Sequence, residues 1–501
     1  MEKKRKQVIL LMTDTTRFDM LGCYGNSGMK TPNLDALAEE GIRFERAYTC
    51  QPVCGPARSA IFTGTYPHSC GGFTNSYALG ANVKTIGQRL TDNGIHAAYI
   101  GKYHLDGGDY FGLGRCPEGW DEEYWYDMRM YLNELTPEER VRSRQDGQNE
   151  GITEDFLYAN RVCRRAVDFL NRYGEEDFFL TVSLDEPHGP SLCPEPYSSM
   201  YQDYEFPKYP NVYDTLEGKP DYQKVWAGER RLGDREQVKI KAPSFFGCNS
   251  YADHELGKVI RAAKECAPDA LIIYTSDHGD ALQSHCLWSK GPAAYDEIAR
   301  IPLIISGGKK GEVAQAPVSH INLVPTILEY MGLPIPKLLE GKSILPMLED
   351  PQLDINHEIY LEFTRYEVDH DGFGGFRPMR TVFDGRYKLS VHLLDRVDEL
   401  YDLESDPYEM KNLILEEAYY EKARELHEKL LNWMNETRDP FRGYDWERRP
   451  WRKEAAEATW DYTGYTRQRE NEEYEPRQLD YSTGLEMVEA SRPKEKLKLG
   501  K

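Results

Sequence analysis

The 501-residue sequence has no hydrophobic run long enough to cross a membrane. Its first apolar run, Val8 to Met12, is soon followed by Asp14 and Arg17, whereas a spanning helix needs about 20 apolar residues. The basic start, residues 1–6, is not followed by the apolar stretch that a signal peptide requires. We therefore expect neither a signal peptide nor a membrane span, and we interpret the run as a buried strand.

The sequence also lacks the cysteine spacing of a small disulfide-rich domain. Its ten cysteines are scattered along the chain, which is typical of free thiols in a reducing compartment. We therefore expect a cytoplasmic protein whose cysteines are not paired.

Acidic residues outnumber basic ones. The chain has 62 Lys and Arg against 84 Asp and Glu, which gives a formal net charge of −22. This balance argues against nucleic acid or another polyanion as the main partner, although a small anion can still enter a locally positive pocket. Hydrophobic residues make up 40% and charged residues 29%, an ordinary globular balance. The length allows large cores and more than one domain.

The most informative stretch runs from Cys54 to Gly64. Pro56 fits the first turn of a helix because its missing N–H would have no partner there, and Gly64 fits the end of that helix. Cys54 would lie where the helix start lowers the pKa of a thiol and favours a bound anion. Arg58 lies on the same face and can bind an anionic oxygen. The stretch predicts a nucleophile beside an anion-binding arginine, and a buried cysteine beside a structural arginine is the alternative.

Polar residues also follow four predicted buried strands. They are Asp14 after strand 8–12, Lys102 and His104 after strand 97–100, His188 after strand 178–184, and Asp277 with His278 after strand 271–274. In an open α/β sheet, ligands bind beyond the carboxyl ends of the strands. Each of these residues also has a structural explanation, as a helix cap, a turn residue, a buried histidine or a surface lysine.

Two kinds of chemistry suit these residues. Asp14, Asp277 and His278 together offer the ligands that a hard divalent cation prefers. Lys102 and His104 alternate along an extended segment, so both side chains can face one side. A cation and an acid–base group in that arrangement can stabilise charge on a leaving oxygen.

Several motifs together resemble the type I sulfatases of the alkaline-phosphatase superfamily, over roughly residues 8–438. The matching motifs are Cys54-x-Pro56-x-Arg58 with Thr63-Gly64, Gly101-Lys102-x-His104, Pro187-His188-x-Pro190, Asp277-His278, and the block around Lys290. Cys50 also stands two residues before a proline, but Cys54 occupies the position where the arginine should be. Only Cys54 therefore fits the signature.

The resemblance implies a mechanism and a set of site residues. In this family a maturation enzyme oxidises the cysteine to formylglycine, whose hydrated aldehyde attacks the sulfur. Carried over by motif, the implied roles are Cys54 as the nucleophile; Asp14, Cys54, Asp277 and His278 as ligands of one divalent metal ion; Arg58, Lys102 and Lys290 as the groups that offset sulfate charge; and His104 or His188 as the acid for the leaving oxygen. The order of the two histidines stays open. Asn75 can donate to a sulfate or sugar oxygen, or it can be a turn residue.

The sequence departs from the family pattern at Thr15, where a second acidic metal ligand is usual. Calcium is the usual ion of the family, and Thr15 together with His278 leaves manganese or magnesium open. The same combination resembles the phosphonate monoester hydrolases and the choline sulfatases.

The resemblance also implies the fold. We expect a doubly wound mixed α/β sheet flanked by helices over residues 1–350, as in alkaline phosphatase and the sulfatases. A smaller C-terminal α+β subdomain should follow over residues 351–440, because short alternating runs there predict antiparallel strands before a helix at 416–438. Residues 441–501 lie outside the resemblance, and the sequence does not choose between a packed, an oligomer-forming and a disordered extension.

The expected segments between the motifs are less regular. Apolar spacing predicts helices at 83–93, 156–173 and 250–266. The stretch 193–243 is expected to run over the active-site face and to take part in substrate selection. The aromatic stretch 110–131 can wall a sugar subsite by stacking, or it can pack irregularly.

The implied activity is hydrolysis of a sulfate monoester. A small sulfated sugar is the expected substrate, such as a glycosaminoglycan-derived oligosaccharide, with a uronate 2-O-sulfate among the candidates. A phosphonate monoester or phosphodiester hydrolase with the same site, and a non-catalytic pseudoenzyme that binds sulfated glycans, are the alternatives. The expected partners are the sugar and a formylglycine-generating enzyme, with neither nucleic acid nor membrane; a homo-oligomer stays open.

Overall fold

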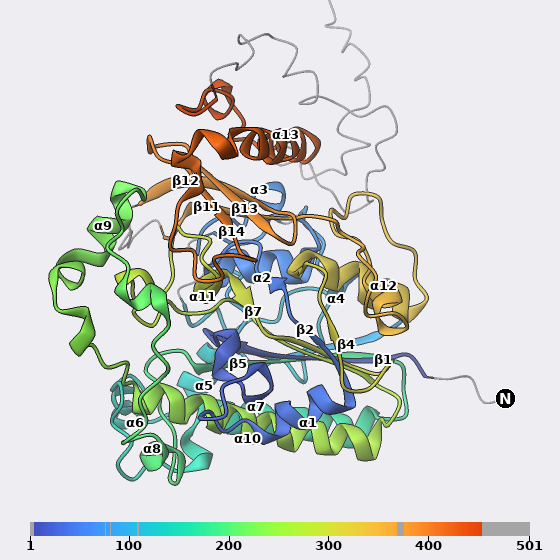
Figure 1. Ribbon diagram of the computed structural model, residues 1–501. Helices are drawn as coiled ribbons and strands as arrows, with labels where there is room; N and C mark the ends of the chain where they lie inside the picture. The colour runs from blue at the N-terminus through green and yellow to red at the C-terminus, as the bar shows by residue number, and fades with distance from the viewer. Residues whose placement is uncertain (1–4, 76, 81, 108–109, 368–374, 453–501) are drawn as a thin grey trace, which may run out of the picture.

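The computed structural model describes residues 5–75, 77–80, 82–107, 110–367 and 375–452. Within them, a mixed seven-stranded sheet forms the centre of the molecule (Figure 1). In the order in which they pair, its strands are β4 (His96–Gly101), β5 (Phe178–Pro187), β1 (Gln7–Asp14), β6 (Leu271–Ser276), β8 (Leu303–Ser306), β2 (Gly41–Phe44) and β9 (Glu312–Ala314). The first four strands are parallel, whereas β8 runs antiparallel to both β6 and β2.

Strand β1 shows why its sequence is continuously apolar. Val8, Leu10 and Met12 contact one hydrophobic core, and Ile9 and Leu11 contact another on the opposite face of the sheet. Successive side chains of a strand point to opposite faces, so a strand covered on both faces needs apolar residues at every position. The prediction of a buried strand here is confirmed.

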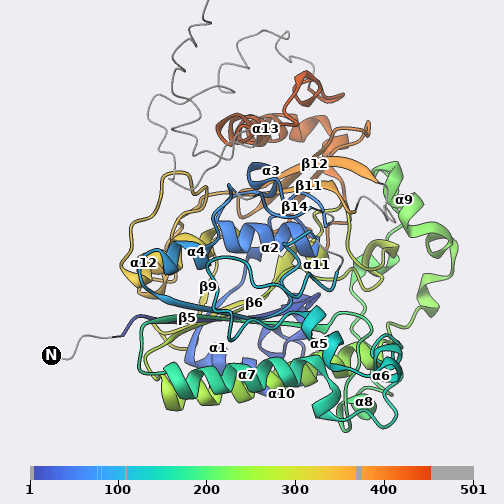
Figure 2. The same ribbon diagram turned by 180° about the vertical axis from the view of Figure 1, so that it is seen from behind.

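Helices cover both faces of the central sheet (Figures 1 and 2). On one face lie α1 (Pro32–Glu40), α7 (Tyr158–Tyr173) and α10 (Pro243–Cys266). On the other lie α2 (Cys54–Thr63), α4 (Ile86–Thr91) and α12 (Leu323–Met331). The predicted doubly wound α/β arrangement is therefore confirmed.

Several predicted helix boundaries were wrong, and helices α10 and α4 show why. Helix α10 begins at Pro243 rather than Ser250, because Pro243 takes a place in the first turn and the helix runs on without a break. Helix α4 covers only Ile86–Thr91 of the predicted 83–93, because the side chains of Thr85 and Gln88 cap its start.

The remaining helices of the α/β part are short. They are α3 (Pro67–Cys70), α5 (Met128–Glu134), α6 (Pro137–Arg142), α8 (Tyr197–Met200), α9 (Asp221–Ala227) and α11 (Asp296–Ala299). Two of them, α8 and α9, lie within the predicted excursion at 193–243. No helix in the described part of the chain is both long and apolar enough to cross a membrane.

The C-terminal part contains a second sheet, as predicted. Its strands β11 (Ile359–Arg365), β12 (Phe376–Phe383), β13 (Tyr387–His392) and β14 (Glu399–Asp402) pair antiparallel in chain order. Helix α13 (Tyr420–Glu436) packs against this sheet through a shared core (Figure 1). A small three-stranded sheet also forms, from β10 (Val318–Ser319), β3 (Ala47–Tyr48) and β7 (Arg300–Ile301).

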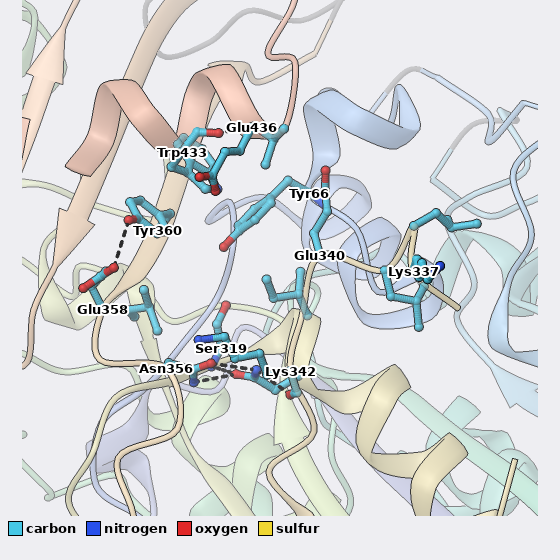
Figure 3. Close-up of a pocket in the computed structure, with 16 residues that line it drawn as sticks. Tyr66, Ser319, Lys337, Glu340, Lys342, Asn356, Glu358, Tyr360, Trp433 and Glu436 are labelled. Atoms are coloured by element: carbon cyan, nitrogen blue, oxygen red, sulfur yellow. Dashed lines mark hydrogen bonds between the residues drawn. The ribbon is translucent and has the colours of Figure 1, made fainter. Parts of the chain in front are cut away.

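A cavity of about 320 Å³ lies where the C-terminal sheet and α13 meet the α/β part (Figure 3). Tyr66 and Ser319 approach it from the α/β part, and Tyr360 and Trp433 approach it from the C-terminal part. The rings of Tyr360 and Trp433 stack with their centroids 4.8 Å apart, and Tyr66 meets Trp433 edge-on at 4.8 Å. Aromatic contacts thus join the two parts beside this cavity.

Residues 441–452, at the start of the predicted extension, pack against the C-terminal sheet and α13. The Trp446 side chain is fully buried, and its Nε1 donates to the Phe441 carbonyl at 2.8 Å. The Trp451 Nε1 donates to Asp398 Oδ2 at 2.7 Å. The rest of the extension, residues 453–501, lies outside the described residues.

Replacement of Trp446 with alanine is expected to lower the free energy of unfolding by about 3–5 kcal/mol, because it leaves a large cavity in the C-terminal core. Urea unfolding would measure the change. The matched control is Leu415→Ala, since the Leu415 side chain is 57% exposed and should change stability by less than about 0.5 kcal/mol. A loss as small for Trp446→Ala as for the control would contradict the packing of this segment.

Candidate active site

The candidate site lies at the carboxyl edge of the central sheet. The neighbouring parallel strands β4, β5, β1 and β6 all end there. Asp14 closes β1, Lys102 follows β4, and Asp277 follows β6. Because the carboxyl ends of adjacent parallel strands meet at one edge, segments far apart in the sequence contribute to a single site.

Helix α2 starts at the same edge. It begins at Cys54, and Gly64 ends it, as predicted, in a left-handed conformation with φ of 71°. The Cys54 Sγ lies 3.2 Å from His278 Nε2 and 3.8 Å from Asp14 Oδ1. The Gly55 N–H donates to Asn75 Oδ1 at 2.8 Å, so Asn75 also reaches the helix start, through a bond that a capping residue would make.

Four buried side chains form a cluster that could hold a metal ion. Asp14, Cys54, Asp277 and His278 each offer one ligand atom, and these atoms all lie within 4.8 Å of one another. The His278 Nδ1 lies 2.9 Å from the Gly279 carbonyl. A carbonyl only accepts, so Nδ1 carries the proton and the Nε2 lone pair faces the carboxylates, as a metal ligand requires.

The charges of this cluster also suit a cation. Burial and the neighbouring Asp14 raise the pKa of Asp277 to about 7, because two close carboxylates cannot both ionise freely. A divalent cation between them would remove that repulsion. Carboxylate oxygens are the ligands that Mg²⁺, Mn²⁺ and Ca²⁺ prefer, so the two acids of the cluster fit the expected ion.

Thr15, at the position of the missing acidic ligand, binds both carboxylates. Its Oγ1 donates to Asp14 Oδ1 at 2.6 Å, and its backbone N–H donates to Asp277 Oδ1 at 3.2 Å. Its φ is 67°, a left-handed conformation that is strained for a β-branched residue. The hydroxyl and the amide of Thr15 thus orient the two neighbouring carboxylates instead of adding a third.

The Arg58 side chain is fully buried and bound by protein groups on several sides. Its Nε lies 3.1 Å from Asp277 Oδ2, and one terminal nitrogen lies 3.2 Å from Asp14 Oδ2. The other terminal nitrogen donates to the Lys102 carbonyl and to Ser183 Oγ at 2.7 and 2.8 Å. That Arg58 also binds the anionic ligand stays a prediction. In this structure its guanidinium binds the carboxylates of Asp14 and Asp277.

Lys102 links the cluster to two residues that were not predicted for the site. Its Nζ lies 2.7 Å from Asp14 Oδ2, 2.9 Å from Asp185 Oδ1 and 3.8 Å from the centroid of the Tyr110 ring. The Tyr110 hydroxyl also donates to Asp185 and lies 3.0 Å from His188 Nδ1. Asp185 carried the same signal as Asp14, an acid at the end of a buried strand. No signal distinguished Tyr110 from its aromatic neighbours.

We expect Asp185→Asn to lower kcat/KM about 10-fold to 100-fold, the range seen when an outer partner of a functional group is lost. The substitution keeps the shape but removes the charge that fixes the Lys102 ammonium. The matched control is Asp168→Asn, which removes a carboxylate that accepts from Tyr124 at 2.7 Å. Steady-state kinetics of both variants would measure the effect, and equal kcat/KM values would contradict a role for Asp185 at the site.

Buried cations surround Cys54. Burial and the Asp14 carboxylate oppose ionisation of its thiol, but Lys290, Lys102 and His278 together lower the pKa of Cys54 to about 5. The same positive charges would attract any anion at this helix start. The Lys290 side chain is buried, and the pKa of its ammonium is raised because the attraction of Cys54 and of the acids around it outweighs burial.

The two candidate acid–base histidines differ in their surroundings. Burial and the Lys102 charge lower the pKa of His104 to about 3, and its Nδ1 has no hydrogen-bond partner in the described part of the chain. Burial and the Lys290 charge also lower the pKa of His188. Of the two, His188 lines the spaces through which a ligand can approach.

Two hollows open beside His188, and both are also lined by Asp146. The Lys290 hollow, of about 400 Å³, is further lined by Thr15, Asp280, Trp288 and Lys290, among others. The Tyr110 hollow, of about 380 Å³, is further lined by Tyr110, Phe111, Tyr131, Arg144, Asp185 and Glu186, among others. The predicted aromatic stretch 110–131 therefore divides in two. Tyr110 and Phe111 line a hollow, whereas Trp120 and Trp125 pack in the core beside the sheet.

The chain matches two protein-family models and several known proteins. A family model described as sulfatase matches residues 6–333, and one described as the C-terminal part of N-sulphoglucosamine sulphohydrolase matches residues 284–436. The chain is 42% identical over 493 residues to the uncharacterized sulfatase YidJ of Escherichia coli (strain K12), covering 96% of this chain and 97% of that protein.

Two more distant similarities point the same way. The chain is 24% identical to an N-acetylglucosamine-6-O-sulfatase of Bacteroides thetaiotaomicron, over 89% of this chain and 88% of that one. A solved structure described as a complex with its substrate D-glucosamine-2-N,6-O-disulfate superimposes with a TM-score of 0.72, at 22% identity over 87% of this chain and 99% of the other. The likeness to this solved structure supports the fold described above.

Proposed function

This chain belongs to the sulfatase family of sulfuric ester hydrolases, and from that membership we propose that it hydrolyses a sulfate ester of a sugar with a formylglycine made from Cys54. One observation carries the proposal: Cys54 lies at the start of a buried helix with its Sγ within 4.8 Å of ligand atoms of Asp14, Asp277 and His278. The Cys54 thiol marks the position that the oxygens of the hydrated aldehyde would occupy. A formylglycine-generating enzyme is the partner that this proposal requires.

The four residues of the cluster would hold one divalent cation. Such an ion supplies a Lewis acid that polarises a sulfate oxygen and favours the ionised form of the nucleophile. Arg58 and Thr15 keep Asp14 and Asp277 in position for it. We propose Ca²⁺, the usual ion of the family, and leave Mn²⁺ and Mg²⁺ as the alternatives for this donor set.

The cationic side chains would bind the sulfate group and stabilise its transition state. Lys102 and Lys290 are buried beside Cys54, so their charges act on an anion there with little screening. Asn75 reaches the same helix start and can donate through its amide. These contacts would hold the sulfur in line with the nucleophile and would exclude water from the reacting atoms.

We assign protonation of the leaving oxygen to His188 rather than to His104. A leaving sugar must extend into open space, and His188 lines both hollows whereas His104 lines neither. The neighbouring Tyr110 hydroxyl lies 3.0 Å from His188 Nδ1 and would orient its ring. His104 would then act from the enclosed side, on the nucleophile.

A sulfated sugar is the proposed substrate class. The N-acetylglucosamine-6-O-sulfatase relative acts on such a sugar by its name, and aromatic rings beside the site suit a sugar face. A phosphonate monoester or phosphodiester hydrolase is the second candidate. The chain resembles the phosphonate monoester hydrolases in having Thr15 where an acidic metal ligand is usual, together with His278. A sulfated-glycan-binding pseudoenzyme is the third.

The deciding experiment uses protein produced together with a formylglycine-generating enzyme. Peptide mass spectrometry across Cys54 would report the aldehyde, and ion chromatography would identify the anion released from matched sulfate and phosphate esters. We expect an aldehyde at position 54 and release of sulfate. Faster release of phosphate would favour the second candidate, and sugar binding by fully matured protein without turnover would favour the third.

A further inference from the structure

The Tyr110 hollow lies beside the reacting centre. Its lining includes His188 and Asp185, which contact Tyr110 and Lys102 at the site, and also Phe111, Tyr131 and Arg144. Its volume of about 380 Å³ falls within the range of small-ligand sites, roughly 300–1,000 Å³. A group attached to the leaving oxygen at His188 would therefore have room to extend into it.

Arg144 brings an uncommitted positive charge to this hollow. Its side chain is exposed, and its guanidinium carbon lies 5.0 Å from the centroid of the Phe111 ring. No carboxylate lies within ion-pair distance of Arg144 among the described residues. By contrast, Arg161 and Arg165 of the nearby helix α7 both pair with Glu134, at 2.7 and 2.9 Å. A guanidinium held against an aromatic ring keeps its donors free for a ligand.

The acids of the hollow do not neutralise Arg144. The Asp185 carboxylate is paired with Lys102 at 2.9 Å and accepts from Tyr110. Burial and Asp185 raise the pKa of Glu186 to about 8, so this carboxyl is protonated at neutral pH. Asp146 is exposed on the rim that the two hollows share. The positive charge of Arg144 thus faces a space whose buried acids are already paired or neutral.

We propose that the Tyr110 hollow receives the part of the substrate next to the sulfate ester, and that Arg144 binds a second anionic group there. That group is a carboxylate or a further sulfate, because the planar guanidinium binds both with two parallel hydrogen bonds. The inference rests on the proposed function and deepens it. Arg144 would determine specificity, favouring sugars with two anionic groups over sugars with one.

The test compares wild type with Arg144→Ala, Arg144→Lys and the matched control Arg140→Ala. Arg140 is an exposed arginine of helix α6, four residues before Arg144, and it does not line the hollow. The probes are 4-nitrophenyl sulfate and N-acetylglucosamine 6-sulfate, with one anionic group, and glucosamine 2-N,6-O-disulfate and an unsaturated uronate 2-sulfate disaccharide, with two. Calorimetry would measure Kd for the three sugars, and steady-state kinetics would measure kcat/KM for all four.

For at least one doubly charged sugar, Arg144→Ala should lower both affinity and kcat/KM about 10-fold to 100-fold, the value of a charge-assisted pair. Arg144→Lys should lose less, because a lysine keeps the charge without the planar fork. The singly charged probes and Arg140→Ala should change less than about twofold. The sugar that loses affinity identifies the second group as carboxylate or sulfate.

Equal losses on singly and doubly charged probes, or no loss on either, would overturn the role of Arg144. Failure of the proposed function has a different signature. In that case no sulfate is released from any probe by any variant, while calorimetry still compares how tightly wild type and Arg144→Ala bind the disulfated sugar.

Discussion

Replacing Cys54 with alanine is expected to lower kcat for sulfate ester hydrolysis by a factor on the order of 10⁴ to 10⁶, the loss typical of a removed nucleophile. Alanine cannot be oxidised to an aldehyde, so no diol can form at the helix start. The remaining cations would still bind a sulfate ester, and KM should change far less than kcat. Steady-state kinetics with 4-nitrophenyl sulfate on co-matured protein would measure both.

The matched control is Cys50→Ala, because Cys50 also stands two residues before a proline. The Cys50 Sγ lies 3.2 Å from Ser319 Oγ, and this cysteine does not belong to the metal-binding cluster. Cys50→Ala should keep the aldehyde at position 54 and a kcat within about twofold of wild type. An aldehyde at position 50, or a Cys54→Ala variant that keeps a tenth of the wild-type rate, would remove Cys54 from the mechanism.

Part of this site was predictable because of the geometry of parallel sheets. Asp14, Lys102 and Asp277 each follow an apolar run, and the carboxyl ends of adjacent parallel strands must share one edge. Helix α2 was predictable because Pro56 and Gly64 mark its start and its end. Local sequence signals of this kind do not depend on knowing which strands become neighbours.

Other features depend on neighbours that no local pattern reveals. The sequence around Arg58 does not reveal that the strand ends of β1 and β6 bring two carboxylates against it. Tyr110 was indistinguishable from Trp120 and Trp125 in one aromatic stretch. Whether a ring there faces a hollow or the core depends on how the stretch packs beside the sheet, and this follows only from the assembled fold.

Replacing Asp277 with asparagine is expected to remove most of the bound metal. The substitution keeps the size of the side chain, but it removes one of two carboxylates from a four-residue cluster. Metal affinity should fall by more than the roughly 10-fold to 100-fold that the loss of an outer partner causes, and kcat/KM should fall with it. Elemental analysis of dialysed protein would measure the metal content, with one equivalent expected in wild type.

Stability gives a readout of the same site that does not depend on activity. An ion that binds only the folded chain raises Tm as its concentration increases, so added metal should raise the Tm of stripped wild type and leave that of Asp277→Asn nearly unchanged. The matched control is Glu154→Gln, in the other group of potential ligands, formed by Glu154, His254 and Glu255. Lys258 already pairs with both carboxylates of that group, at 2.9 and 2.7 Å, so the control should keep its metal and its response. Full metal content in Asp277→Asn, or loss of metal in Glu154→Gln, would contradict a metal site beside Cys54. The proposed nucleophile would then have no cation to activate it.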